Sequence, residues 1–234
     1  MEIGPGRGEL TGLIAKTAGF VFAVELDKKL SELLKTNLRE YKNIEVINKD
    51  FLKVNLKLIS SKLNKRLKVI GNIPYYITSP ILEHLINNRS VIDTVYLTVQ
   101  KEFAKRIIAI KGGKDYSSFS CFVQYYAVPK IHFTINRNCF FPKPNVDSAF
   151  ISLSIKDNQA LTQSHERRLF KIIRSAFNQR RKTLRNSLKY VIPQKRLDMF
   201  FQENSISPNT RPEDLSLADF INLSKKQKKS LTKG

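Results

Sequence analysis

The residues best suited to chemistry stand in one short segment, Asn72-Ile73-Pro74-Tyr75-Tyr76. The apolar run before it, over residues 67–70, is typical of a β-strand, and Pro74 biases Ile73 toward an extended conformation, so we expect the chain to leave a sheet here without starting a helix. The segment offers an amide, aromatic rings and backbone carbonyls that we expect to be free of ladder hydrogen bonds. These groups suit a planar, amine-bearing substrate such as a nucleobase. The competing interpretation is a loop with buried aromatic side chains.

A glycine-rich turn near the start of the chain predicts a nucleotide-type ligand. Gly4, Gly6 and Gly8 precede a helical pattern of apolar residues, as in a strand–turn–helix where the backbone approaches a ligand closely. A second strand, over residues 20–24, ends at Glu25, 21 positions after Gly4. At this spacing an α/β site places a carboxylate on a ribose diol. The pair indicates a cofactor that contains adenosine; the alternative is a plain turn and a helix-capping Glu.

Other ligands and sites are disfavoured by the motifs. The glycine pattern is GxGxG and not GxGxxG, and no GxxxxGK[ST] sequence occurs, which argues against an NTPase.

Asp50 follows an apolar run over residues 44–47, so it stands at a strand end as Asn72 does. Ligands of open α/β sheets bind at the carboxyl ends of the strands, and we therefore expect the glycine turn, Glu25, Asp50 and Asn72 to meet at one edge. For Asp50 the alternative is the N-cap of a short turn.

These side chains need a sheet that places successive strand ends next to one another. Strands and helices alternate up to residue 155, which predicts a mostly parallel sheet with helices on both faces. We expect Asp27 to cap one helix and Pro80 to be the first residue of another. The basic segment 54–65 is expected to be a surface loop or a short helix. Further strands are expected over residues 91–99, 130–134 and 149–155, and further helices over residues 101–110 and 118–127.

A proline-stiffened loop over residues 138–144 presents Phe140 and Phe141 between the last two expected strands. Core packing is the commoner fate of such a pair. The sharper hypothesis is that the loop supplies a second wall for a stacked base.

The charge of the chain points to a polyanion. Lys and Arg number 41 against 20 Asp and Glu, a net charge of +21, which favours a nucleic-acid partner over a membrane surface. Residues 165–196 alone carry eleven Lys or Arg and one Glu, so we expect this part to grip RNA or DNA. No apolar run approaches a membrane span. Cys121 and Cys139 lack a metal-ligand pattern, which predicts small apolar packing residues, no metal and a reduced, cytoplasmic protein.

Composition divides the chain after a polar linker at residues 156–159. We expect a cofactor-binding α/β domain over residues 1–156, a small all-helical basic domain over 157–224 and a disordered lysine-rich tail over 225–234. The chain opens with only three residues of its first strand, too few for the centre of a sheet, so we expect that further residues precede Met1. Because cofactor contacts would lie there, we also expect this chain to bind its cofactor weakly.

Residues 1–155, with their glycine turn and N-I-P-Y tetrapeptide, resemble a class I methyltransferase that uses S-adenosylmethionine and acts on adenine N6. The segments 140–148 (FFPKPNVDS) and 177–188 (FNQRRKTLRNSL) are similar to those of the ribosomal RNA small-subunit adenine dimethyltransferases. The resemblance covers nearly the whole chain. One departure is that nothing here matches the family's N-terminal Q-x-F-L-type motif. The resemblance implies a Rossmann-like methyltransferase sheet followed by a small all-α domain.

The resemblance also implies a role for each site residue. Asn72 and the carbonyl of Pro74 would accept the two hydrogens of the adenine amine, and Tyr75 and Phe140 would stack on the two faces of the base. In the cofactor site, Glu25 would hold the ribose and Asp50 the adenine amine. The turn over residues 4–8, with Gly4 and Gly6, would hold the methionine end, and Asn72 would contact the cofactor as well as the base.

The expected function is dimethylation of two adjacent adenosines near the 3′ end of small-subunit (16S) ribosomal RNA, by a monomer acting on a pre-30S particle. Three alternatives remain. One is a large-subunit rRNA methylase that confers resistance, because such enzymes share N-I-P-Y. Another is a non-catalytic ribosome-assembly factor. A nicotinamide-linked oxidoreductase is opposed by the GxGxG pattern and by the absence of a histidine placed for hydride chemistry.

Overall fold

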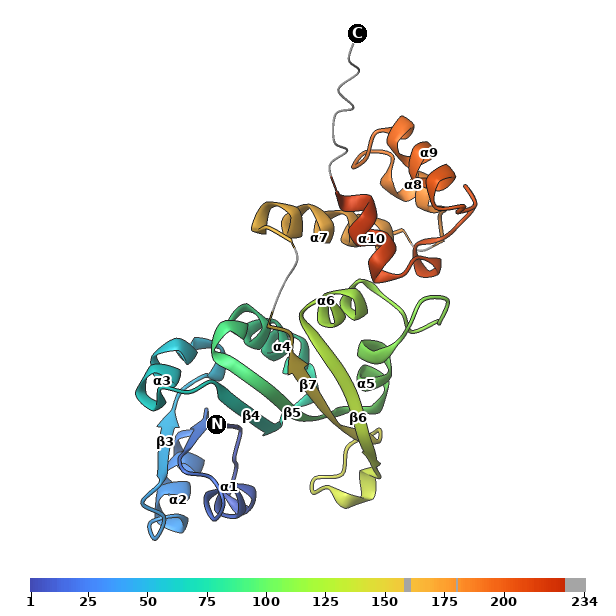
Figure 1. Cartoon of the computed structure of the whole chain (residues 1–234). Coiled ribbons are helices and arrows are strands. Elements are labelled where there is room, and N and C mark those ends of the chain that lie inside the picture. The colour runs from blue at the N-terminus through green and yellow to red at the C-terminus, as the bar shows by residue number, and fades with distance from the viewer. Residues whose placement is uncertain (158–160, 180, 226–234) are drawn as a thin grey trace. The chain divides into compact units, whose positions relative to one another are not determined.

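A computed structural model of the chain describes residues 1–157, 161–179 and 181–225 (Figure 1). Two compact units are present. The first comprises Met1–Ala104 and Tyr126–Asp157. The second comprises Lys105–Tyr125 and the residues from Asn158 onward. None of the helices in the described ranges has the length and apolar composition of a membrane-spanning segment.

The first unit is built on one seven-stranded sheet with the order β3-β2-β1-β4-β5-β7-β6. β3, β2, β1, β4 and β5 are parallel, while β7 is antiparallel to both of its neighbours, β5 and β6. This confirms the expected α/β class with a mostly parallel sheet. The strands are β1 (Glu2–Ile3), β2 (Val21–Glu25), β3 (Ile44–Asn48), β4 (Leu67–Asn72), β5 (Ile92–Gln100), β6 (Ala127–Ile135) and β7 (Ser148–Ile155).

The short first strand lies in the middle of this sheet. Glu2 and Ile3 pair with β2 on one side and with β4 on the other, and both residues are buried. Gly71 of β4 faces this strand so closely that a Cβ there would lie 3.1 Å from the carbonyl oxygen of Ile3. β2 is buried along its whole length, as expected for a strand covered on both faces.

The helices of the first unit follow local signals in the sequence. Asp27 caps α2 by accepting a hydrogen bond from the Leu30 N–H at 3.0 Å, as predicted. The segment 54–65 contains a helix, α3, capped by Asn55. Pro80 is the third residue of α4 and not the first, because the helix begins at Thr78, directly after a 3-10 turn. The helices are α1 (Glu9–Ala15), α2 (Lys28–Asn37), α3 (Leu56–Leu63), α4 (Thr78–Asn87) and α5 (Lys101–Ile108), the last of which continues into the second unit.

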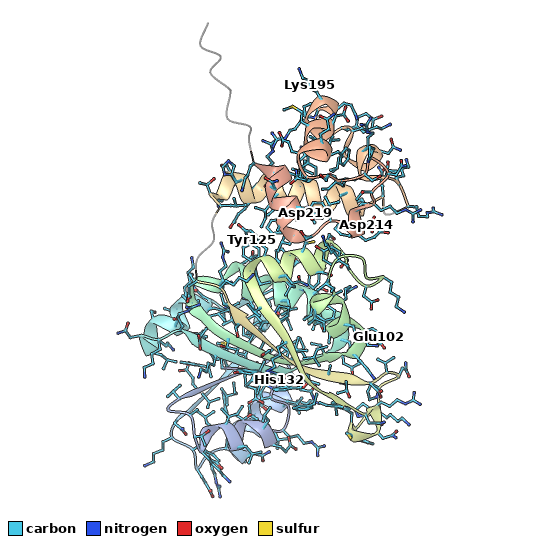
Figure 2. All side chains as sticks on the ribbon, turned by 45° about the vertical axis from the view of Figure 1, so that its right-hand side comes forward. Glu102, Tyr125, His132, Lys195, Asp214 and Asp219 are labelled. Carbon is cyan, nitrogen blue, oxygen red and sulfur yellow. The ribbon has the colours of Figure 1, made fainter. Side chains whose placement is uncertain are left out.

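The second unit is helical, with α6 (Ser118–Tyr126), α7 (Gln163–Phe177), α8 (Leu184–Leu188), α9 (Gln194–Glu203) and α10 (Leu217–Ser224). Its centre is formed by aromatic contacts that join α7, α10 and the segment just before α6: the ring centroid of Phe177 lies 5.7 Å from that of Tyr116 and 5.9 Å from that of Phe220. Ser216 caps α10: its Oγ accepts a hydrogen bond from the Asp219 N–H at 3.1 Å, and Oδ2 of Asp219, which Figure 2 labels, accepts one from the Ser216 N–H at 2.8 Å.

The division of the chain differs from the expected one in one respect. Residues 105–125 lie between two strands of the sheet in sequence, yet they belong to the helical unit. The physical reason is that Phe122 and Tyr125 pack their rings against Phe170 of α7. Of the expected tail, residues 226–234 lie outside the described residues, as do residues 158–160 of the linker and Arg180.

The two cysteines occupy opposite environments. Cys121 is fully buried, and burial raises the pKa of its thiol to about 11. Cys139 is exposed, so the expectation that both thiols are packing residues is wrong for this one. Because only a thiolate reacts rapidly, we expect a thiol reagent such as dithionitrobenzoate to modify Cys139 alone in the native protein and both residues in denaturant. A Cys139→Ala variant that still reacts before unfolding would contradict this assignment.

Candidate active site

The predicted site residues meet at one edge of the sheet, where the parallel strands end. Glu25 of β2 is in register with Asn48 of β3, and Asn72 of β4 is in register with Thr98 of β5. β7 brings a further loop to this edge because it is antiparallel: it starts at Ser148, opposite the last residues of β5 and β6. Figure 1 shows that the loop which carries Phe140 joins the lower ends of β6 and β7.

The glycine turn follows β1 and has three residues in the left-handed region, Gly4 (φ 62°), Gly6 (φ 60°) and Gly8 (φ 93°). A Cβ on Gly4 or Gly6 would meet no atom within 4 Å, whereas a Cβ on Gly8 would lie 2.7 Å from Leu34 Cδ1. The first two glycines therefore border open space that a ligand can occupy, and the third is a packing position under α1.

This difference predicts separate effects of two substitutions. Gly8→Ala combines a left-handed backbone with a steric contact, so we expect it to lower the free energy of unfolding by about 2 kcal/mol. Gly6→Ala carries the backbone cost alone, so it should destabilise the fold less and reduce cofactor binding more. Urea denaturation and cofactor titration of the two variants measure these effects. Equal loss of stability in both variants would contradict the distinction.

Glu25 is held beside the glycine turn by the backbone. Its side chain is buried, with 7% of the residue exposed. Oε2 accepts a hydrogen bond from the Gly6 N–H at 3.2 Å, and Oε1 accepts one from the Asp27 N–H at 3.0 Å. Each carboxylate oxygen keeps capacity for another donor. The carboxylate is thus fixed at the strand end, where a ribose diol can donate to it.

Asp50 follows β3 and caps the 3-10 turn Phe51–Lys53, with Oδ1 accepting from the Leu52 N–H at 3.0 Å. The structure is compatible with both interpretations of Asp50, as the N-cap of a turn and as a cofactor ligand, because the capping hydrogen bond occupies only one of its oxygens. Within the described part of the chain, Oδ2 has no hydrogen-bond partner.

His84 of α4 lies close to the Asp50 carboxylate and was not predicted as a site residue from the sequence. Its ring meets the ring of Phe51 edge-on, with centroids 5.5 Å apart. Burial lowers the pKa of His84, while the backbone of Val54 and the charge of Asp50 act in the opposite direction. No spacing or motif singles out this histidine, since only the approach of α4 to the turn after β3 brings it here.

Asn72 is the last residue of β4, and its side chain is exposed. Among the residues that the structure describes, its amide makes no hydrogen bond, so both polar atoms are open to a substrate. The segment after it differs from the prediction because helical structure does start here, whereas the Pro74 carbonyl is free of ladder hydrogen bonds to the described strands, as expected. A 3-10 turn begins at Tyr75, directly after Pro74, and the Pro74 carbonyl accepts a hydrogen bond from the Ile77 N–H at 3.2 Å. A carbonyl has two lone pairs, so one remains for a second donor.

The two tyrosines of the segment face different surroundings. Tyr75 is half-buried, and its hydroxyl oxygen lies 2.6 Å from Ser148 Oγ. Tyr76 is exposed over 85% of its surface. The inner ring is therefore anchored to the sheet and the outer ring is not.

The loop before β7 also carries one half-buried and one exposed aromatic residue next to each other. Phe140 is half-buried and follows the 3-10 turn Arg137–Cys139, while Phe141 is completely exposed. The core-packing alternative therefore fails for Phe141. Phe140 reaches the same sheet edge as Asn72 because β6 and β7 enclose the loop there.

The residues at this edge fit S-adenosylmethionine on chemical grounds. The glycine turn leaves space, and Glu25 offers acceptors for a ribose. Oδ2 of Asp50, which has no partner in the described part of the chain, can accept from an adenine amine. Among the described residues, no group of three or more His, Cys, Asp or Glu could hold a metal ion. The arrangement therefore supplies positioning and electrostatic complementarity for a ligand with an adenosine part.

Comparisons with known proteins identify the family of the chain. A family model described as "Ribosomal RNA adenine dimethylase" matches residues 1–229. A protein of Lachnoclostridium phytofermentans named "Ribosomal RNA small subunit methyltransferase A" is 41% identical over 230 residues, which cover 95% of this chain and 79% of that protein. The protein of the same name from Protochlamydia amoebophila is 39% identical, with the same two coverages.

Two solved structures have the same fold. A dimethyladenosine transferase from Plasmodium falciparum superimposes with a TM-score of 0.81 at 27% identity, covering 95% of this chain and 86% of that one. The 23S rRNA methyltransferase ErmE gives a TM-score of 0.75 at 26% identity, with coverages of 95% and 88%. The α/β unit therefore has the Rossmann-like fold of class I methyltransferases. Because the family model extends over nearly all of the sequence and the curated relatives agree with it, the chain belongs to the ribosomal RNA adenine dimethylase family.

Proposed function

We propose that this protein transfers methyl groups from S-adenosylmethionine to N6 of two adjacent adenosines near the 3′ end of small-subunit ribosomal RNA, within a pre-30S particle. The observation that carries the proposal is the amide of Asn72, which has no hydrogen-bond partner among the described residues and stands at the same sheet edge as the glycine turn and Glu25. The names of the relatives support the small subunit as the source of the RNA.

The chemistry is limited by the weak nucleophilicity of the adenine amine, whose lone pair is delocalised into the ring. Asn72 Oδ1 and the Pro74 carbonyl would each accept one amine hydrogen, which favours a pyramidal nitrogen with its lone pair directed away from both acceptors. The cofactor, when bound, supplies the electrophilic methyl group. Nitrogen gains a bond to this carbon as the carbon–sulfur bond breaks, and the proton then leaves to water. No side chain needs to act as a base, so alignment accounts for the rate.

The base must leave its helix to reach this edge. Tyr75 and Phe140 would stack on its two faces, and a stacking contact of this kind contributes about 1–3 kcal/mol. In the cofactor site, Glu25 would hold the ribose, Asp50 the adenine amine, and the turn with Gly4 and Gly6 the methionine end.

A direct test uses particles that lack the modification. Undermethylated 30S and 50S particles are incubated separately with the protein and with S-adenosylmethionine labelled in its methyl group. We expect label in the 30S particles only. Label confined to 50S particles would favour a large-subunit methylase, a candidate raised by the similarity to ErmE. Tight 30S binding without transfer would favour a non-catalytic assembly factor.

The second unit is proposed to contact the RNA backbone. Arg167, Lys171 and Arg174 recur at helical spacing along α7 and are exposed, while Leu169, Ile172 and Ile173 of the same helix are buried. α7 thus presents a basic stripe opposite its apolar face. Lys195 of α9 also extends into solvent (Figure 2).

Replacing the three stripe residues by Gln is expected to reduce the salt dependence of RNA binding. Each lost phosphate contact lowers the slope of log K against log salt by about 0.7–0.9, so the triple variant should lose about 2–3 in slope. Filter binding across a salt series measures this. A control replaces Lys29, Lys35 and Lys57, which are exposed lysines of α2 and α3. The stripe has no such role if both triple variants change the slope equally.

The protein is further proposed to act in the cytoplasm and as a monomer. The monomeric state is supported because one chain contains both the methyl-transfer edge and the basic helical unit. Light scattering of the purified protein, alone and bound to 30S particles, tests the monomeric state. A dimer in solution would contradict it.

A further inference from the structure

We propose that Ser148 and Asp147 are positioning residues that fix the two aromatic walls of the base pocket relative to each other, and that this spacing controls the second methyl transfer. The inference rests on the proposed function, since it deepens the role given to Tyr75 and Phe140.

Ser148 anchors the first wall. Its Oγ lies 2.6 Å from the hydroxyl oxygen of Tyr75, and Ser148 is fully buried. It begins β7 and is paired with Gln100 of β5 on one side and Ile135 of β6 on the other. Tyr75, in contrast, begins a 3-10 turn of only three residues. A 3-10 turn of this length does not fix the Tyr75 ring by itself. The contact between the Tyr75 hydroxyl and Ser148 therefore holds the ring in place against the sheet.

Asp147 anchors the second wall. Its Oδ1 accepts a hydrogen bond from the Arg137 N–H at 3.1 Å, which joins the two ends of the loop that carries Phe140. Its own carbonyl accepts from the Lys101 N–H at 3.0 Å, and its Oδ2 lies 3.8 Å from Lys101 Nζ. The loop is therefore closed on itself and attached to the end of β5. Asp147 and Ser148 are adjacent in sequence, so two neighbouring residues fix the positions of both aromatic walls.

The second methyl transfer is expected to depend on the two aromatic walls more strongly than the first methyl transfer does. An unmodified amine offers two hydrogens to Asn72 and Pro74, whereas a monomethylated amine offers one. After the first transfer, hydrogen bonding orients the base less, and stacking must orient it more. A loosened wall should therefore slow the second methylation more than the first and raise the ratio of monomethyl to dimethyl product.

The test uses two variants that remove the same contact from opposite ends, Tyr75→Phe and Ser148→Ala, together with the double variant. Time courses on undermethylated 30S particles are analysed by mass spectrometry of the nucleosides. Since a hydrogen bond contributes modestly, we expect each single variant to raise the ratio of monomethyl to dimethyl product by about 2- to 10-fold. The double variant should raise it no further, because the contact is shared. An unchanged ratio, or fully multiplicative effects, would overturn the proposal.

Ser152→Ala is the matched control. Ser152 is another buried serine of β7, and its Oγ lies 2.9 Å from Nε2 of His132, which Figure 2 labels on β6. The substitution removes a buried hydroxyl and its hydrogen bond from the same strand, away from the pocket. We expect it to leave the product ratio unchanged even if it lowers thermal stability. A ratio that rises equally in this control would indicate a general effect of destabilising β7 and would contradict the assignment.

A readout without catalysis separates this inference from the proposed function. Hydrogen–deuterium exchange of the Arg137 amide should become faster in Asp147→Ala, which loses its acceptor, and remain unchanged in Ser152→Ala. If wild-type protein transfers no methyl group to 30S particles, the proposed function fails, while exchange still reports whether Asp147 holds the loop. Unchanged exchange in Asp147→Ala would refute the positioning role regardless of activity.

Discussion

Asn72→Ala is expected to lower the rate of methyl transfer by about 100- to 1,000-fold, the loss seen when one preorganised polar contact to a reacting group is removed. The substitution deletes the acceptor that orients the adenine amine. It removes no hydrogen bond within the described part of the protein, because the amide is unpartnered and exposed there. Thermal stability should therefore stay close to that of the wild type. Single-turnover transfer from labelled cofactor to 30S particles measures the rate.

Asn72→Asp provides the matched comparison. It keeps an oxygen acceptor at the same position and replaces only the NH2 group, so we expect it to retain more activity than Asn72→Ala. Cofactor titration of both variants separates presentation of the amine from any contact of Asn72 with the cofactor. Wild-type rates in Asn72→Ala, or a rate loss explained wholly by weaker cofactor binding, would contradict the catalytic role.

Glu25→Ala is expected to weaken binding of S-adenosylmethionine by about 10- to 100-fold, because hydrogen bonds to a charged group contribute about 1.5–3 kcal/mol. The same change leaves the N–H groups of Gly6 and Asp27 without their acceptor and so loosens the glycine turn. The loss should appear in the cofactor dissociation constant and in the cofactor KM, while kcat at saturating cofactor falls less.

Glu25→Gln and Glu32→Gln refine this experiment. Gln at position 25 keeps one acceptor oxygen but places an NH2 group where a backbone N–H now donates, so its affinity should lie between those of the wild type and Glu25→Ala. Glu32 is an exposed residue of α2, and the same substitution there removes a charge without touching the turn. Equal effects at both positions would show that net charge, and not the contact at the strand end, governs cofactor binding.

Much of the first unit could be predicted because its signals are local. The alternation of apolar runs identified the parallel strands, and Asp27 identified the start of α2. The rule that ligands bind at carboxyl strand ends then brought Glu25, Asp50 and Asn72 to one edge without any knowledge of tertiary contacts. For these residues, sequence position and spatial position are related by the parallel register of the sheet.

The remaining features depend on contacts between distant segments. Ser148 lies opposite Tyr75 because β7 runs antiparallel, and no spacing in the chain reveals this direction. His84 reaches Asp50 only through the packing of α4. Residues 105–125 join the helical unit because of aromatic contacts with α7, which composition does not show. The roles of Asn72, Pro74, Tyr75 and Phe140 stay predictions until they are measured.

The sheet edge with Asn72 is proposed to dimethylate two neighbouring adenosines of small-subunit RNA. The most direct measurement is mass spectrometry of nuclease fragments from 30S particles treated with wild-type protein or with Asn72→Ala. We expect N6,N6-dimethyladenosine at two adjacent positions near the 3′ end with the wild-type protein and almost none with the variant. Modification elsewhere, or equal modification by both proteins, would contradict it.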